Sequence, residues 1–244
     1  MARHNQYAES LKSQSDWIPF LLAESGLPGP RGNLELMAAV ADYGDEAMFK
    51  HLITLDRHEG SSTANEFLPC CGVVGMGALL AKKQIEVLPD IRNYANDERW
   101  RLREAAAMAL QRWGKADMPA LIDEMIIWAG GTFLEKRAAA AALCEPALLK
   151  RPVDTGRVLA ILDSITGSFS EVQNRKDENF RSLRQGLAYC WSVAVAALPD
   201  EGKTLMEKWM VNPDSDIRWL MKENLKKNRL VKIETAWTAA WMAK

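Results

Sequence analysis

The sequence predicts an all-α fold, a solenoid of paired antiparallel helices. Three observations predict it. Apolar residues recur at helical spacing, no segment alternates apolar and polar residues as a half-buried strand would, and turn-forming residues divide the chain into pieces about one helix long. Because 48% of the 244 residues are hydrophobic, the chain has ample apolar surface for such helices to bury.

Helical periodicity is clearest in the segment 98–113. Its apolar residues fall at positions i, i+3, i+4, i+7, i+8 and i+11, and they are Leu102, Ala105, Ala106, Ala109, Leu110 and Trp113. Residues at this spacing share one face of a helix. We therefore expect that face to be buried against a neighbouring helix.

Glycine, proline and asparagine residues separate the remaining helical segments. The predicted helices span residues 7–25, 33–43, 45–55, 65–82, 84–94, 98–113, 117–129, 133–145, 154–166, 178–197, 201–211, 215–227 and 231–242.

An internal repeat indicates how these helices are arranged. The segments Asn96–Leu110 and Asn212–Leu225 each place a polar turn before an apolar residue, an Arg and then a Leu seven positions later. Looser copies carry the Arg at Arg137 and Arg184. The separations between Arg103, Arg137, Arg184 and Arg218 are 34, 47 and 34 residues, which is the period of a helix-pair repeat.

The polar turn followed by an Arg that opens an Ala/Leu-rich helix resembles the second helix of the HEAT-repeat family. This resemblance implies a right-handed α-α superhelix of about six antiparallel helix pairs with a C-terminal capping helix. It implies one domain over residues 1–244, with a possible subdivision near 146–153. In this family the Arg commonly bonds to an Asp of the preceding repeat, which implies a structural role for Arg103 and Arg218.

The charge balance excludes a general attraction to polyanions, since the formal net charge is −1. Residues 1–95 carry 8 Lys+Arg and 12 Asp+Glu, which leaves 23 and 20 for residues 96–244. Nucleic acid is therefore a possible partner only through the more basic C-terminal part. The N-terminus has no apolar signal region, and the apolar run Phe67–Ala81 is shorter than the ~20 residues of a spanning helix, so we expect a cytoplasmic protein.

No motif indicates catalysis, a cofactor or a metal. The glycines in Gly72–Gly77 lack the preceding strand and the spacing of a nucleotide-binding loop, and they favour close helix packing. His51 and His58 with Cys70 and Cys71 match no metal-ligand spacing. The four cysteines, which also include Cys144 and Cys190, are expected to be reduced core thiols.

Tryptophan is the unusual component, with nine copies. Trp113, Trp128 and Trp191 lie in apolar stripes and are expected in the core. Trp100 and Trp219 lie among cations at the start of predicted second helices, where an aromatic side chain can stack on a ligand. The candidate binding residues are Trp100, Arg99, Arg101, Arg103, Arg184, Arg218, Trp219 and Lys222.

A second resemblance concerns the HEAT-like DNA alkylation repair glycosylases. Their Trp-x-x-x-Asp arrangement is similar to Trp100–Glu104, with Glu in place of Asp, and their later Arg and Trp would fall on Arg137 and Trp191. This resemblance implies DNA binding or repair of alkylated bases. The alternative for Glu104 is a carboxylate that the helix dipole favours in a first turn.

Two further segments offer sites. The polar segment 167–179 is the longest insertion between the predicted helices, and it is either a binding loop or a solvated connection. Trp237 and Trp241, at i and i+4, either cap the last repeat or form a homodimer interface. The HEAT-like resemblance favours a non-catalytic scaffold whose concave face binds a protein or peptide, with the DNA-binding protein as the alternative.

Overall fold

The computed structural model describes residues 2–55 and 63–243, and all regular structure within these ranges is helical. The prediction of an all-α fold is therefore confirmed. His58 and most of the predicted connection between the helices 45–55 and 65–82 lie outside the described ranges. Packing divides the chain into two compact units, Met1–Ala116 and Asp117–Lys244, and the segment 146–153 lies inside the second unit.

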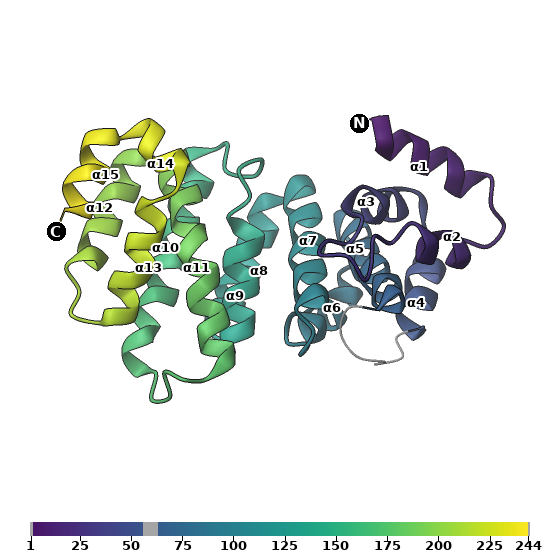
Figure 1. Cartoon of the computed structure of the whole chain (residues 1–244), viewed down its shortest axis with the longest axis horizontal. Helices are drawn as coiled ribbons and strands as arrows, with labels where there is room; N and C mark the ends of the chain where they lie inside the picture. Colours follow the sequence, from purple (N-terminus) through teal and green to yellow (C-terminus); the bar gives the residue numbers. More distant parts are fainter. Residues whose placement is uncertain (1, 56–62, 244) are drawn as a thin grey trace. The chain divides into compact units, whose positions relative to one another are not determined.

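The first unit is built around the apolar helix α5 (Figure 1). Helices α1, α3, α5 and α7 pack in succession, while α4 packs on α5 and α6 packs on α7. The elements of this unit are α1 (Ala2–Lys12), α2 (Ile18–Ala23), α3 (Leu34–Tyr43), α4 (Glu46–Thr54), η1 (Ala64–Glu66), α5 (Phe67–Ala81), η2 (Ile85–Val87), α6 (Leu88–Ala95) and α7 (Trp100–Ala116).

The glycines of α5 allow neighbouring helices to approach closely, as the sequence predicts. A Cβ atom on Gly77 would lie 2.4 Å from the carbonyl oxygen of Ala109 in α7, and one on Gly75 would lie 2.2 Å from the Phe49 ring in α4. By length and composition the segment Ala64–Ala81 could cross a membrane, but 78% of it is buried inside the unit. This burial is typical of the central helix of a folded core.

The second unit contains two rows of helices (Figure 1). One row consists of α9, α11 and α13, the other of α8, α10 and α12, and consecutive helices pack across the rows. The elements of this unit are α8 (Met118–Ala129), α9 (Phe133–Leu143), α10 (Pro152–Gly167), η3 (Ser168–Glu171), α11 (Glu178–Ala197), α12 (Pro199–Met210), α13 (Ser215–Leu225), α14 (Asn228–Ile233) and α15 (Thr235–Met242).

Local side-chain chemistry explains where many of these helices begin. Asn33, Asp45, Asp117 and Asp214 precede helices and accept hydrogen bonds from backbone N–H groups of the first turn. Such caps satisfy donors that the helix itself leaves unpaired. At α9, Thr132 forms a complete capping box with Glu135.

Two predicted helices are each divided in two. The prediction of one helix over 7–25 is wrong because the chain leaves the helix after Lys12, and the Asp16 carboxylate accepts from the N–H of Ile18 before Pro19. The prediction of one helix over 231–242 is wrong because Glu234 leaves the helical conformation, with φ −141° and ψ 63°. Each half then starts its own hydrogen-bonding pattern.

The two segments that match best in sequence also match in structure. Arg103 Nη1 donates to the carbonyl oxygens of Asp97 and Glu98, both at 2.7 Å. Arg218 Nη1 makes the corresponding bonds, at 3.0 Å to the carbonyl of Asn212 and 2.7 Å to that of Pro213. The repeat Arg therefore binds the turn that precedes its own helix.

The expected core residues are buried. Trp128 and Trp191 are completely enclosed and Trp113 is 7% exposed, so their prediction as core residues is confirmed. All four cysteines are buried free thiols. Burial raises the pKa of the thiols of Cys71 and Cys144 well above that of an exposed cysteine.

Candidate binding sites

The buried cations predicted at the start of α7 form ion pairs inside the first unit. Arg99 is 7% exposed and pairs with Asp97, with Nη2 2.8 Å from Oδ2. Arg101 is 8% exposed, pairs with buried Glu66 at 3.2 Å and places its guanidinium carbon 4.5 Å from the centre of the Trp100 ring. The charges of Arg99 and Arg101 are thus neutralised within the unit. Trp100 is the large side chain of this cluster that is exposed.

The predicted residues of the second unit are arranged similarly. Arg184 of α11 pairs with Asp216, and its guanidinium carbon lies 4.5 Å from the centre of the Trp219 ring. Trp219 is 38% exposed and Lys222 is exposed on the same helix, α13. Arg218 is committed to the turn carbonyls described above.

Trp100 and Trp219 do not occupy equivalent places in the repeat. When the two segments are aligned on Arg103 and Arg218, Trp100 falls on Ser215 and Trp219 falls on Glu104. The two tryptophans also belong to different units. Trp100 and Trp219 are therefore two separate candidate contact residues, one in each unit.

The residues of the glycosylase resemblance are distributed over both units. Trp100 and Glu104 lie on α7, whereas Arg137 lies on α9 and Trp191 on α11. Trp191 is completely buried, and its indole Nε1 donates to Thr166 Oγ1 at 3.0 Å. In this position its ring packs in the core and offers no face to a base.

The segment 167–179 is anchored to the second unit by Arg175. Its Nη2 donates to Asp214 and to the carbonyl of Phe169, both at 2.7 Å, and its Nη1 pairs with Asp216 at 3.1 Å. Phe169 is completely buried and stacks edge-on against Phe180 at 4.9 Å. Through Arg175, the segment 167–179 therefore binds to the start of α13 and also connects α10 to α11.

The tryptophans of α15 are bound within their own unit. The indole N–H groups of Trp237 and Trp241 donate to the same oxygen of Glu207 on α12, at 2.6 Å and 3.3 Å. These bonds are the contacts that a capping helix would make. The homodimer alternative for these two residues stays a prediction.

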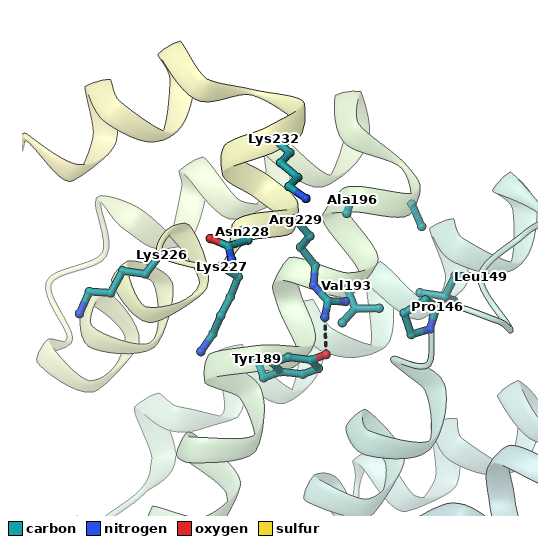
Figure 2. Close-up of a pocket in the computed structure, with 11 residues that line it drawn as sticks. Pro146, Leu149, Tyr189, Val193, Ala196, Lys226, Lys227, Asn228, Arg229 and Lys232 are labelled. Carbon is teal, nitrogen blue, oxygen red and sulfur yellow. Dashed lines mark hydrogen bonds between the residues drawn. The ribbon is translucent and has the colours of Figure 1, made fainter. Parts of the chain in front are cut away.

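A more open site lies elsewhere in the second unit (Figure 2). It is a pocket of about 800 Å³, which is within the size range of small-ligand sites. The pocket is lined by Pro146 and Leu149 from the connection between α9 and α10, by Tyr189, Val193, Ala196 and Ala197 of α11, and by Lys226, Lys227, Asn228, Arg229 and Lys232 around the start of α14.

Among the residues that the structure describes, the lining of this pocket contains four cations and no carboxylate. Lys226 pairs with Glu223, which lies outside the lining. Within residues 2–55 and 63–243, no carboxylate forms an ion pair with Lys227, Arg229 or Lys232. These three side chains therefore line the pocket and have no ion-pair partner among the described residues.

Tyr189 holds two of these cations in place. The guanidinium carbon of Arg229 lies 4.6 Å from the ring centre, and Arg229 Nη2 donates to the tyrosine hydroxyl (Figure 2). Lys227 Nζ lies 5.9 Å from the same ring centre. Cation–π contacts of this kind attract a cation to the ring and leave its charge in place.

The residues of this pocket are not among those that the sequence predicts to bind a ligand. The sequence feature that points to this pocket is the basic segment 226–232, Lys-Lys-Asn-Arg-Leu-Val-Lys, which has four cations and no acid. The segment spans the junction between two predicted helices, so periodicity does not assign its side chains to a common face. The apolar residues of the pocket come from parts of the chain far from this run.

Comparison of the chain with models of protein families, with curated proteins and with solved structures found no match. The binding sites are therefore assigned from their own geometry and charge.

Proposed function

We propose that this protein is a non-catalytic, HEAT-like binding scaffold that holds a protein or peptide partner. In this proposal the helix pairs stack into a right-handed superhelix, and α15 caps its C-terminal end. The protein acts in the cytoplasm and needs no cofactor.

Two features of the helices support a repeat architecture. The rows α9–α11–α13 and α8–α10–α12 pack side by side in the second unit, as stacked pairs would. The matching bonds of Arg103 and Arg218 to their preceding turns support the proposal that the sequence repeat is also a structural repeat.

The observation that carries the binding proposal is the pocket beside Tyr189. It is open, it combines an apolar wall with unneutralised cations, and it is built on three separate segments of a packed unit. Such sites recognise ligands through a few polar groups on an otherwise apolar surface. A protein partner supplies both kinds of group, so it is the occupant we propose.

Site-specific photo-crosslinking in the native host tests this proposal. A photoreactive phenylalanine analogue is placed at Asn228, which lines the pocket and is exposed. The matched control carries the same analogue at Val153, which is 60% exposed on α10 of the same unit. We expect Asn228 to capture one protein that Val153 does not.

The identity of the captured molecule separates the proposed function from its alternative. Capture of a protein at Asn228 that is lost when Lys232→Glu is added supports the scaffold. Capture of nucleic acid instead supports the DNA-binding alternative, and equal capture at Asn228 and Val153 excludes the pocket as a partner site.

A further inference from the structure

We infer that the pocket beside Tyr189 recognises an acidic peptide segment in which an apolar side chain neighbours an Asp or Glu carboxylate. The inference rests on the proposed binding function and specifies the chemistry of the partner. The carboxylate would lie among Lys227, Arg229 and Lys232, and the apolar side chain would contact Pro146 and Leu149.

Charge is the first argument for this occupant. The side chains of Lys227, Arg229 and Lys232 bring like charges together at one pocket, where they repel one another. An anion that enters the pocket relieves this repulsion and forms charge-assisted hydrogen bonds with the same groups. Since the whole chain has a formal net charge of −1, this attraction is local to the pocket.

The apolar wall is the second argument. Pro146, Leu149, Val193, Ala196 and Ala197 all line the pocket together with the cations. A free phosphate ion would use the cations and leave this wall exposed to water. A peptide with an apolar side chain beside its carboxylate covers the wall, and the burial adds to its affinity.

The state of Tyr189 is the third argument, and it disfavours a nucleotide. A base would need a free aromatic face on which to stack. The guanidinium of Arg229 already lies over the Tyr189 ring, at 4.6 Å, and is bonded to its hydroxyl. Tyr189 therefore positions a cation for an anionic group and does not present that face to a base.

Fluorescence anisotropy with defined probes tests the inference. The probe is a fluorescein-labelled peptide of eight residues in which Glu alternates with Leu, and the comparison peptide has Gln in place of every Glu. Inorganic phosphate and a single-stranded oligonucleotide are added as competitors. We expect the Glu peptide to bind at least ~10-fold more tightly than the Gln peptide, because only the Glu peptide pairs with the cations.

The variant Arg229→Gln/Lys232→Gln removes one Arg and one Lys from the pocket. Its matched control, Lys176→Gln/Arg181→Gln, removes the same charges from exposed positions near the opposite end of α11. We expect the pocket variant to weaken binding of the Glu peptide by ~10-fold or more and the control to change it by less than about twofold. Lys232→Glu, at an exposed side chain, repeats the test in a variant that keeps the contact between Arg229 and Tyr189.

The results separate a failure of the acidic-peptide inference from a failure of the proposed scaffold function. Equal binding of the Glu and Gln peptides, or equal loss in the pocket and control variants, overturns the acidic-peptide inference. Displacement of the peptide by the oligonucleotide at lower concentration than by the unlabelled peptide also overturns it. If a protein is crosslinked at Asn228 while the Glu peptide fails to bind, the scaffold function stands and only the acidic chemistry is rejected.

Discussion

Arg229 and Tyr189 form a two-part contact across the pocket of the second unit: the guanidinium carbon lies 4.6 Å from the ring centre, and Nη2 donates to the hydroxyl. Tyr189 lies on α11 and Arg229 on α14, so the contact joins two elements separated by α12 and α13 in the sequence. It also fixes the direction in which the remaining donors of Arg229 point. The affinity of the pocket should therefore depend on Tyr189 even though the residue carries no charge.

Replacement of this ring should weaken ligand binding moderately. A cation–π contact at an exposed site contributes ~0.5–1 kcal/mol, so we expect Tyr189→Ala to weaken binding of the Glu peptide by about two- to fivefold. Tyr43→Ala is the matched control, because Tyr43 is also exposed and has Lys12 Nζ 5.2 Å from its ring centre in the first unit. Anisotropy titrations measure both, and an equal effect of the two variants would contradict the positioning role.

The two tryptophans of α7 should differ in their effect on stability. Trp113 is 7% exposed and Trp100 is 47% exposed, although both belong to the same helix. Trp113→Ala should lower the free energy of unfolding by ~3–5 kcal/mol because it leaves a cavity. Trp100→Ala should cost roughly 1 kcal/mol or less. Thermal melts followed by circular dichroism compare them, and a larger loss for Trp100→Ala would place this residue among the structural ones.

Both repeated arginines should stabilise the protein. Arg103 and Arg218 each donate to two carbonyl oxygens of the preceding turn, and hydrogen bonds from charged groups contribute about 1.5–3 kcal/mol. We expect Arg103→Ala and Arg218→Ala both to destabilise the protein in chemical denaturation, with the larger loss for Arg103→Ala because Arg103 is half-buried and Arg218 is exposed. Arg181→Ala, at an exposed position, is the control and should have little effect. A loss confined to one of the two variants would show that the turns are not equivalent repeats.

The buried thiols should make stability depend on pH in the alkaline range. Burial raises the pKa of Cys71 and Cys144 above 9.0, the value for an exposed thiol. When the pH rises through 9.0, the unfolded chain therefore loses these protons while the folded chain keeps them. The free energy of unfolding should consequently fall above this pH, and the fall should be smaller in Cys71→Ala/Cys144→Ala.

Denaturant titrations at several pH values measure this difference in slope between the parent and the variant. The comparison cancels the contributions of Lys and Tyr groups, which both proteins share. Identical slopes would mean that the two thiols ionise in the folded protein as they do in the unfolded chain. We also expect a thiol reagent to label the native cysteines slowly. The thiolate is the reactive form, and a raised pKa keeps the thiol protonated.

The sequence by itself determined the helical class and the repeated turn. Apolar spacing such as that of Leu102, Ala106 and Trp113 depends on the chain's own periodicity, and the bonds of Arg103 and Arg218 reach only five or six residues back. Features of this kind involve neighbours in the chain, so a single sequence contains all the information they need.

Tertiary packing alone decided which polar and aromatic side chains remain available to a ligand. Arg101 is neutralised by Glu66, 35 residues away, and Trp191 is enclosed by helices that meet it only after folding. The pocket combines residues 146–149, 189–197 and 226–232, whose separations along the chain carry no common period. Burial and charge pairing depend on distances in space, and those distances are set when the helices pack.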